Sequence, residues 1–459
     1  MLDRINKYLF TRVDNAGLVL FRIAFGFLLT VEAYGAIATG WVRRTFMDPE
    51  FTFNFIGFDF LQPLPGNGMY IYFAVMGVFG IAVMLGYKYR WSMAGYALMW
   101  MCVYLMQKSS YNNHYYLMML LTWMMVLVPA AGRMSLDAKL NPERKSISMP
   151  RWVQTLVVGQ LLIVFTYAAI AKIYPDWLDG TVTRLFMKSK ADYWLIGDFL
   201  QLPWVHWGMA YFGILFDLLV IPMYMWRKTR WLAFGLSLFF HLFNSAVFHI
   251  GIFPYMSIAF ALFFFSSETL VKRFMPAEEV YRGDEVRIPK TGTITTAILV
   301  GYLFVQFALP LRHWFIAEPV LWTEEGHRLS WRMMLRTKSG RVIYYIVDKA
   351  DPNKKKIAYS YKDLLSKKQY RSFRTKPDFI WQLAQRIHQI EKEKGKDVEV
   401  YATVRVKVNA GSYHLLVDES VDLASVSWDQ LKHASWLLPA PENFTKIEKK
   451  KDSESSTQK

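Results

Sequence analysis

The stretch GLVLFRIAFGFLLTVEAYGAIA, from Gly17 to Ala38, decides the class of fold. It is almost entirely apolar, and a helix of about 20 such residues crosses the hydrocarbon core of a bilayer. Further apolar runs follow along the chain, so we expect an α-helical membrane bundle with eight or nine spans. The predicted stretches are Gly17–Ala38, Met69–Tyr87, Trp91–Gln107, Tyr115–Ala131, Val153–Ile173, Trp207–Trp226, Trp231–Phe248, Phe253–Phe265 and Thr293–Leu309.

The composition further restricts which bonds and binding sites the chain can form. Its 459 residues are 53% hydrophobic, yet the formal net charge is +17, and this charge lies between and after the apolar runs. The single cysteine, Cys102, lies within one run, which rules out an internal disulfide and a cysteine-based metal site. We expect the basic residues to mark membrane topology, and we expect no nucleic-acid partner.

The distribution of lysine and arginine predicts the orientation of the spans. Cytoplasmic loops of membrane proteins carry an excess of these residues. With a cytoplasmic N-terminus, the inner segments hold 18 lysines and arginines and the outer segments hold 6. This orientation places everything after Leu311 on the outer face, which is the periplasm in a bacterium and the organelle lumen in a eukaryote.

The sequence changes character from Arg312 onward. Arg341–Lys349 and Val398–Ala410 alternate apolar and polar residues, as half-buried strands do. Between them, Asp378–Gly395 has apolar residues at helical spacing and ends in glycine. These patterns predict a small α+β domain outside the membrane, followed by a disordered tail. The predicted boundaries are 1–16 for a cytoplasmic N-terminus, 17–311 for the transmembrane domain, 312–440 for the outer domain and 441–459 for the tail.

Polar side chains within spans are costly and are therefore candidates for function. The first group is SSYNNHYYL, Ser109–Leu117, at the outer mouth of the fourth span. An asparagine such as Asn113 beside His114 could fix the tautomer of the imidazole and orient a substrate carbonyl or carboxylate. The alternative is that these side chains are ordinary polar residues at the membrane boundary.

The second group is TYAAIAKIYPDW, Thr166–Trp177, which places Lys172 near the outer end of the fifth span. Burial disfavours the charged form of a lysine, so Lys172 could act as a general base near neutral pH. The alternative is that its long side chain extends to the lipid headgroups.

The third group is FFHLFNSAVFHIGIFPY, Phe239–Tyr255, which combines His241 and Asn244 with a glycine at Gly251. A break in the backbone at membrane depth is tolerated where it lines a cavity or packs against protein. The short eighth run could therefore form a broken or re-entrant pair with the seventh. No carboxylate or cysteine at a supporting spacing accompanies His241 and His249, so we expect no metal.

Several segments match one known family, in order, from about Asp14 to Pro439. The specific ones are NNHYYL, with His114, and GQLLIVFTYAAIAKIYPDWLDG, with Lys172. Supporting segments are VDNAGLVLFRIAFGFLL, VHWGMAYFGILFDLL, FHLFNSAVFHIGIFPY, LPLRHW and GHRLSWRMMLRTKSGRV. On these segments the chain resembles the vitamin K-dependent γ-carboxylase family, as a bacterial-type member with a horizontally transferred transmembrane (HTTM) domain.

The resemblance implies a peptidyl-glutamate 4-carboxylase that uses reduced vitamin K or menaquinol with O2 and CO2, and neither metal nor biotin. Such enzymes oxygenate the hydroquinone to the 2,3-epoxide and use the strong base formed on the way to carboxylate glutamate in a protein or peptide. A lysine in the position of Lys172 deprotonates the hydroquinone, and His114 is expected to assist carboxylation. The expected binding residues for quinone and glutamate are Asn113, His241, Asn244, Phe253, His327, Ser330, Trp331, Met333 and Met334.

The chain departs from the family pattern at His327, where a tyrosine is usual, and it lacks the C-terminal extension and the disulfide of animal members. We therefore expect a compact bacterial member in the inner membrane, with its outer domain in the periplasm. Two other functions stay open. One is oxygenation of vitamin K or menaquinol without carboxylation, and the other is a non-enzymatic transporter or scaffold. A transporter would be expected to contain inverted repeats, and the sequence has no visible repeat.

Overall fold

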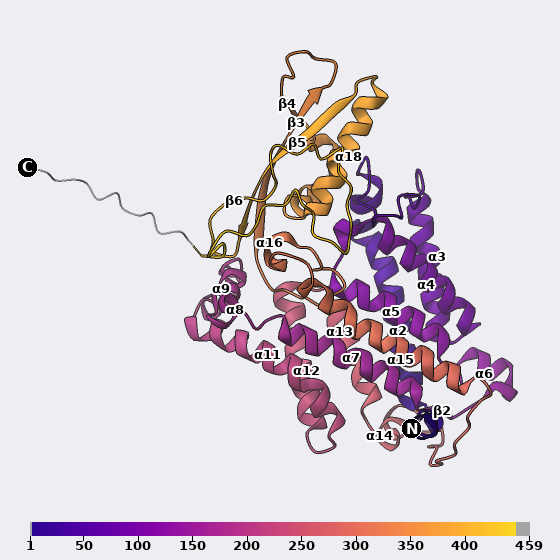
Figure 1. The fold of residues 1–459 in the computed structure, drawn as a ribbon. Coiled ribbons are helices and arrows are strands. Elements are labelled where there is room, and N and C mark those ends of the chain that lie inside the picture. The colour runs from indigo at the N-terminus through magenta and orange to yellow at the C-terminus, as the bar shows by residue number, and fades with distance from the viewer. Residues whose placement is uncertain (1, 447–459) are drawn as a thin grey trace, which may run out of the picture. The chain divides into compact units, whose positions relative to one another are not determined.

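The computed structural model describes residues 2–446, and the chain divides into two compact units. Residues 447–459, which make up most of the predicted tail, lie outside the described residues. Unit 1 is helical and unit 2 contains a sheet (Figure 1). Unit 1 comprises 2–170, Gly213–Leu311 and Leu329–Met333, and unit 2 comprises Ala171–Phe212, Arg312–Arg328 and 334–446.

Every apolar stretch predicted from the sequence forms helix in the structure. Six described helices are long and apolar enough to cross a membrane, or seven if one bent pair counts as a span. This number is roughly consistent with the expected eight or nine, because α4 and α5 are also helical but fall outside that set. The helices are α2 (Ala16–Ala38), α3 (Gly68–Leu85), α4 (Tyr89–Met106), α5 (Asn113–Leu127), α7 (Trp152–Ile170), α11 (Pro203–Met225), α12 (Arg230–Phe248), α13 (Phe253–Ala259, continued by the 3-10 helix η4, Phe260–Phe263) and α15 (Gly292–Leu311).

The bent pair lies one element later than the sequence suggests. α12 ends at Phe248 and α13 begins at Phe253, but the bend of 117° separates Phe253–Phe263 from α14 (Ser267–Phe274). Ser266 caps α14 by accepting a hydrogen bond from the backbone nitrogen of Thr269 at 3.3 Å. A polar cap at this point starts a new helix, so the eighth run ends before α14 and does not continue into it.

Helices α2 and α3 pack closely because small residues lie at their contact. A Cβ added to Gly26 would lie 2.4 Å from the backbone nitrogen of Met84, and one added to Gly80 would lie 2.7 Å from Oγ1 of Thr30. Small residues let helix backbones approach in this way in membranes. A side chain at either glycine would therefore push the two helices apart.

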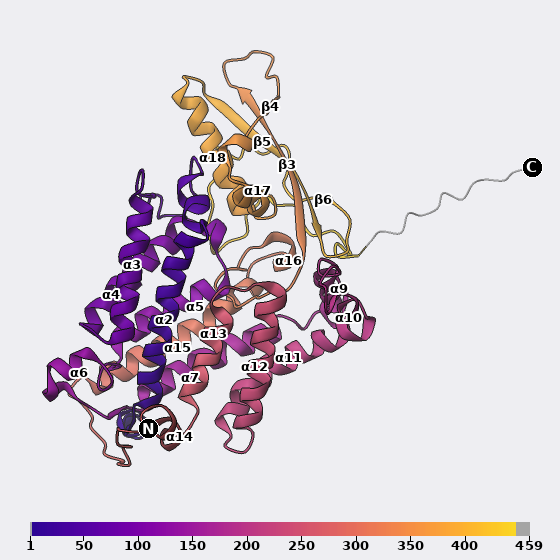
Figure 2. The same cartoon turned by 180° about the vertical axis from the view of Figure 1, so that it is seen from behind.

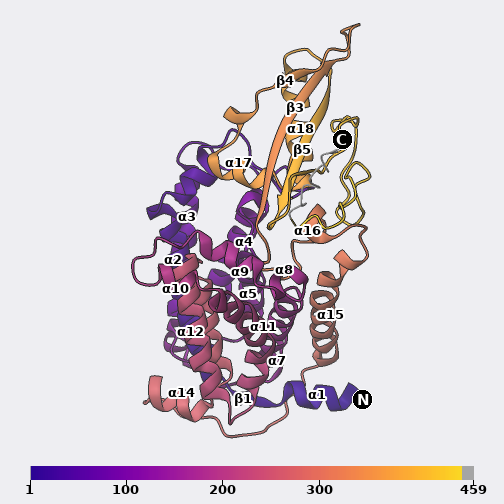
Figure 3. The ribbon, with the colours of Figure 1, turned by 90° about the vertical axis from the view of Figure 1, so that its left-hand side faces the viewer.

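Three segments predicted to lie on the cytoplasmic side meet at one end of unit 1. The short strands β1 (Arg12–Asp14) and β2 (Ser148–Pro150) pair with each other. A buried ion pair of 2.6 Å joins Asp14 to Arg133, and the backbone nitrogen of Tyr281 donates to Asp14 at 2.8 Å. Figures 1 and 2 show α14 and the N-terminus at this same end of unit 1, and Figure 3 shows that they lie on opposite sides of it. The predicted topology requires these segments to share one side of the membrane.

Unit 2 is built on a four-stranded antiparallel sheet with the order β4-β3-β5-β6. The two predicted strands are β3 (Lys338–Asp348) and β5 (Val398–Val408), which pair along their whole length (Figure 3). Every second residue of β5 is buried, as its alternating sequence predicts. The predicted helix is α18 (Pro377–Glu393), and Gly395 beyond it has a φ of 82°, which favours glycine. The other strands are β4 (Ile357–Tyr359) and β6 (His414–Leu415).

Unit 2 also contains a segment that precedes the sheet in the sequence by more than a hundred residues. This segment, Ala171–Phe212, begins directly after α7. It forms short helices because polar and turn residues interrupt its apolar runs. They are α8 (Pro175–Leu178), α9 (Thr181–Lys188), α10 (Gly197–Leu200) and the first part of α11.

Candidate active site

The N-terminus of α5 carries the predicted amide and imidazole. Asn112 caps the helix by accepting a hydrogen bond from the backbone nitrogen of Tyr115 at 2.7 Å, so Asn113 and His114 are its first two residues. The Asn113 side chain is buried, and its Nδ2 donates to the backbone oxygen of Arg332 at 2.9 Å. Asn113 therefore holds a loop that is more than 200 residues away in the sequence.

That loop, Leu329–Met333, is part of unit 1. Its first backbone nitrogen, at Leu329, donates to the hydroxyl of Tyr111 at 2.8 Å. The Trp331 ring stacks on the Tyr116 ring with centroids 4.9 Å apart. Leu329 and Trp331 have φ values of 60° and 55°. Each such conformation costs roughly 1–3 kcal/mol in a residue with a side chain and tends to cluster at functional sites.

The predicted binding residues of this loop are mostly buried. Ser330 is 2% exposed and Trp331 is 1% exposed, while Met333 is half-buried. The Nε1 of Trp331 has no hydrogen-bond partner among the described residues. A buried indole N–H usually finds a partner, so this one is available to a bound molecule.

His114 and His241 lie against the same phenyl ring. The centroid of Phe253 is 5.4 Å from that of His114 and 5.9 Å from that of His241, which it meets edge to face. Phe216 and Phe240 also contact His241, with centroids 5.7 and 5.3 Å away. Two imidazoles from α5 and α12 thus share one aromatic wall.

His241 also has an unused polar atom. Its side chain is 1% exposed, and its Nδ1 has no hydrogen-bond partner among residues 2–446. Asn244 lies one turn further along α12 and is half-buried. Ligand sites commonly combine an apolar lining with a few polar groups of this kind. This wall suits a flat, mainly apolar ring that carries oxygen atoms.

Lys172 lies in unit 2, in the turn that follows α7. The residue is 7% exposed, and its Nζ lies 5.7 Å from the centroid of the Trp177 ring. The indole nitrogen of Trp177 in turn donates to the backbone oxygen of Ala210 at 3.1 Å. The Trp177 ring therefore lies beside the amine of Lys172 and borders it on one side.

The Lys172 turn is fixed to the end of the sheet. Asp176 is buried and accepts hydrogen bonds from Asn409 Nδ2 at 2.7 Å and from Thr445 Oγ1 at 3.1 Å. The hydroxyl of Tyr174 donates to the backbone oxygen of Leu335. No pattern in the sequence predicts these contacts. The only local signal is the YPDW motif that follows Lys172, and nothing in the sequence links it to Asn409.

The remaining predicted residues, His327 and Met334, belong to unit 2, and His327 lies beside a cluster of charges. Glu324 forms ion pairs with Arg336 and with Lys338, the latter at 3.3 Å. His327 Nε2 lies 3.5 Å from the nearest guanidinium nitrogen of Arg336. Met334 is 40% exposed.

Burial is the largest single influence on the pKa of each of three groups in this cluster, although at Glu324 the neighbouring charges together outweigh it. It lowers the pKa of Lys338 to about 8, although Glu324 opposes the shift. Burial alone would raise the pKa of Glu324, but Arg336 and Lys338 outweigh it and hold that pKa below its ordinary value. Burial and the neighbouring Arg328 lower the pKa of Lys376 to about 7. Burial thus lowers the pKa of both lysines from the ordinary value of a lysine.

The structure groups the predicted residues within each unit. In unit 1, His114, His241 and Phe253 are in contact, and Asn113 and Trp331 both anchor the Leu329–Met333 loop. Tyr111 and Tyr116, which hold the same loop, were missed as site residues even though they flank the NNH motif. Unit 2 contains the remaining predicted residues, Lys172, His327 and Met334.

Two family models match the chain, and the boundary between their matches does not coincide with the division into two units. A model described as the HTTM domain matches residues 10–268, more than half of the chain. A model described as the vitamin K-dependent gamma-carboxylase, lumenal domain, matches residues 291–443. The chain belongs to the vitamin K-dependent γ-carboxylase family. No solved structure matches it.

Membership in this family supports a carboxylase-like function that depends on vitamin K. Family membership also supports the prediction that this is a membrane protein with a lumenal-type domain in its C-terminal part. The second match covers the sheet of unit 2. The first match covers His114, Lys172 and His241, and the second covers the Leu329–Met333 loop. Both groups of predicted site residues therefore lie inside the matched regions.

Proposed function

We propose that the protein is a vitamin K-dependent γ-glutamyl carboxylase that couples epoxidation of the hydroquinone to carboxylation of peptidyl glutamate. One observation carries the proposal most directly. In a chain of this family, the His114–Phe253–His241 wall and the Leu329–Met333 loop both present a buried nitrogen that has no partner among the described residues.

The residues of this wall fit a quinone. A naphthoquinone ring is flat and apolar but carries two oxygens, which need polar partners when they are buried. Phe253 offers an aromatic face or edge to the ring, and the Nδ1 of His241 offers a hydrogen-bonding atom. Asn244, half-buried one turn away on α12, would add a second polar group.

Vitamin K hydroquinone together with O2 supplies the oxidative chemistry, yielding the 2,3-epoxide and the basicity needed to remove a γ-proton from glutamate. In the proposal, Lys172 accepts the proton of the hydroquinone hydroxyl as a general base. Its turn is held by Asp176 and Asn409, which would keep the amine in a defined position. Such positioning is what a general base requires.

His114 and Asn113 serve the carboxylation half of the proposed reaction. The imidazole of His114 can donate or accept a proton near the glutamate carboxylate, and Phe253 excludes water from one of its faces. Asn113 anchors the Leu329–Met333 loop through its hydrogen bond to the backbone oxygen of Arg332. Ser330, Trp331 and Met333 of this loop are therefore proposed to line the binding site. The proposed peptide-binding residues of unit 2 are His327 and Met334.

The substrate is proposed to be a glutamate-containing protein or peptide that reaches the enzyme from the outer side of the membrane. In a bacterium this side is the periplasm. A lipophilic quinone would arrive through the bilayer and a polar peptide through water. The two family matches, one to a transmembrane domain and one to a lumenal domain, support that arrangement.

A single assay tests the proposal. Purified protein is incubated with vitamin K hydroquinone, labelled CO2 and a glutamate-rich peptide, and epoxide and acid-stable label in the peptide are measured separately. We expect both products. Epoxide without labelled peptide would favour the second candidate, a quinol epoxidase, for which His327 in place of the usual tyrosine is the supporting observation. If quinone binds but neither product forms, the enzyme proposal is wrong and a scaffold or transporter is favoured.

A further inference from the structure

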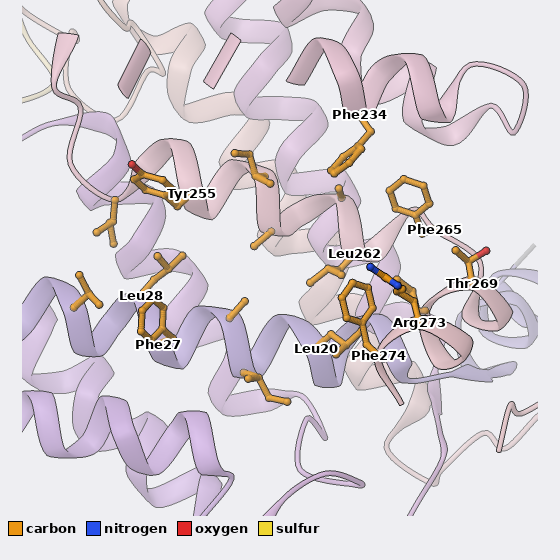
Figure 4. A pocket seen from close by; sticks show the side chains of 18 of the residues that line it. Leu20, Phe27, Leu28, Phe234, Tyr255, Leu262, Phe265, Thr269, Arg273 and Phe274 are labelled. Atoms are coloured by element: carbon orange, nitrogen blue, oxygen red, sulfur yellow. The ribbon is translucent and has the colours of Figure 1, made fainter. Parts of the chain in front are cut away.

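A long apolar groove lies on unit 1, and part of its lining, at Ile252 and Tyr255, is close in the sequence to Phe253 of the proposed site. It has a volume of about 1330 Å³ and is bounded by α2, α12, α13 and α14 (Figure 4). This volume exceeds the ~300–1,000 Å³ of typical small-molecule sites. Phe27 and Tyr255 lie toward one end of the groove, and Arg273 and Phe274 lie at the other.

The length of the groove matches one leaflet of a bilayer. Along α2 its lining runs from Leu20 to Val31. Eleven helical steps of ~1.5 Å give a length of about 16 Å. The hydrocarbon core of a bilayer is ~30 Å thick, so one leaflet contributes about 15 Å. An acyl chain that enters at the Leu20 end would therefore extend to the Val31 end.

The Leu20 end is basic. Lys272 and Arg273, in the last turn of α14, both line the groove there. Neither forms a salt bridge with any residue in the described part of the chain. Figure 4 shows Arg273 beside Phe274 and Leu262, at the end of the groove where Leu20 lies.

Helix α14 holds this charge in place. Leu270 and Val271 are buried in a cluster with Ala16 and Val19 at the start of α2. Lys272 and Arg273 follow these buried residues and are exposed. An amphipathic helix of this kind lies in the membrane interface, with its basic residues at the level of the headgroups.

We propose that the groove binds an anionic phospholipid of the leaflet on the N-terminal side, which is the cytoplasmic side in the predicted topology. One acyl chain lies between α2 and α13, and the phosphate lies on Lys272 and Arg273. Basic pockets between membrane helices on the cytoplasmic side bind anionic headgroups by this combination of charge and apolar contact. The inference is independent of the proposed function.

Native mass spectrometry of the full-length protein in detergent tests this site. Phosphatidylglycerol and phosphatidylcholine with identical acyl chains are titrated separately. We expect tighter binding of phosphatidylglycerol, and the double variant Lys272→Gln/Arg273→Gln should weaken that binding roughly 30-fold. Both residues are exposed, so the substitutions should leave the fold intact.

A matched double variant, Arg227→Gln/Lys228→Gln, removes two exposed charges from the loop before α12, outside the groove. It should retain phosphatidylglycerol at the wild-type affinity. Ala259→Trp, which fills the groove but keeps both charges, should weaken binding of both lipids. Equal affinity for the two lipids, full retention in the Lys272/Arg273 variant, or displacement by inorganic phosphate or by menaquinone would each overturn the proposal.

Discussion

Two regions of the molecule differ in whether their buried polar groups have hydrogen-bond partners. Around His114 in unit 1, the imidazoles lie against aromatic rings, and buried nitrogens of His241 and Trp331 lack a partner among the described residues. Around Lys172 in unit 2, the neighbouring Asp176 is tied to Asn409 and Thr445. The first region keeps hydrogen-bonding capacity for a ligand, whereas the second uses it to fix a turn.

This difference separates two kinds of mutational effect. Changes in the unit 1 wall should alter what is bound and which product forms, because the unsatisfied atoms contribute little to the fold. Changes beside Lys172 should act through the position of the amine, because each hydrogen bond there joins the turn to the sheet.

The largest effect is expected at Lys172 itself. General base catalysis contributes typically ~10²–10⁴-fold, so Lys172→Ala should lower epoxide formation by about that factor. Chromatographic measurement of vitamin K epoxide gives the result. Lys172→Arg is the matched control, since it keeps the positive charge but cannot act as a base. Full epoxidation by Lys172→Ala would remove Lys172 from the mechanism.

The next effect is expected at His114. His114→Ala should reduce label in the glutamate peptide by roughly 10²-fold while part of the epoxidation survives. The ratio of the two products is the informative quantity, because general damage to the wall would lower both. Phe253→Leu provides that comparison, as it alters the same wall without touching a titratable group. A proportional loss of both products in His114→Ala would contradict a role restricted to carboxylation.

Most of the fold follows from patterns that the sequence displays locally. The apolar runs become helices, and the alternation in Val398–Val408 becomes a buried face of the sheet. No local pattern predicts that Ala171–Phe212 belongs to unit 2. The boundary between the units lies between Ile170 and Ala171, which are both part of one apolar motif. What joins this segment to the sheet is a contact between Asp176 and Asn409, 233 residues apart.

The candidate site was predictable in its residue types and not in its contacts. His114, Lys172 and His241 could be identified from the sequence because they are polar residues in or beside apolar runs, and such groups are costly in a membrane. The anchoring of the Leu329–Met333 loop by Asn113 depends on a backbone oxygen, which every residue has and no sequence pattern marks. The positive φ of Trp331 is equally invisible, since tryptophan shows no preference for that conformation.

The charge cluster of unit 2 predicts a dependence of stability on pH. The pKa of Lys338 is lowered from 10.5 to about 8 in the folded protein, whereas the unfolded chain keeps the ordinary value. Between these two pH values the unfolded state binds more protons, so the free energy of unfolding rises as the pH rises. The contribution of Lys338 over the whole window is about 3 kcal/mol.

Hydrogen exchange of β3 amides between pH 7 and 10, corrected for the intrinsic rate, measures this dependence. Lys338→Met should make the curve less steep, because it removes one of the two lysines of unit 2 whose pKa is lowered by burial, the other being Lys376. Lys349→Gln is the control, since Lys349 is largely exposed and pairs with the exposed Asp397. A curve that falls with pH in the wild type, or one that Lys338→Met leaves unchanged, would show that another group controls the stability of unit 2.

The smallest effect is expected at the hydrogen bond between Asn409 and Asp176. Asn409→Ala leaves one oxygen of a buried carboxylate without its donor, which frees the turn that carries Lys172. If Asn409 positions the base, kcat for epoxidation should fall about tenfold while KM for the hydroquinone stays near the wild-type value, since a misplaced catalytic group impairs the reaction more than binding. Thr445→Ala removes the longer bond to the other oxygen, 3.1 Å against 2.7 Å, and should change kcat by less than Asn409→Ala does. A merely structural role would instead lower the melting temperature of unit 2 in Asn409→Ala with no change in kcat per folded molecule, and Asn409→Gln would then restore stability without affecting turnover.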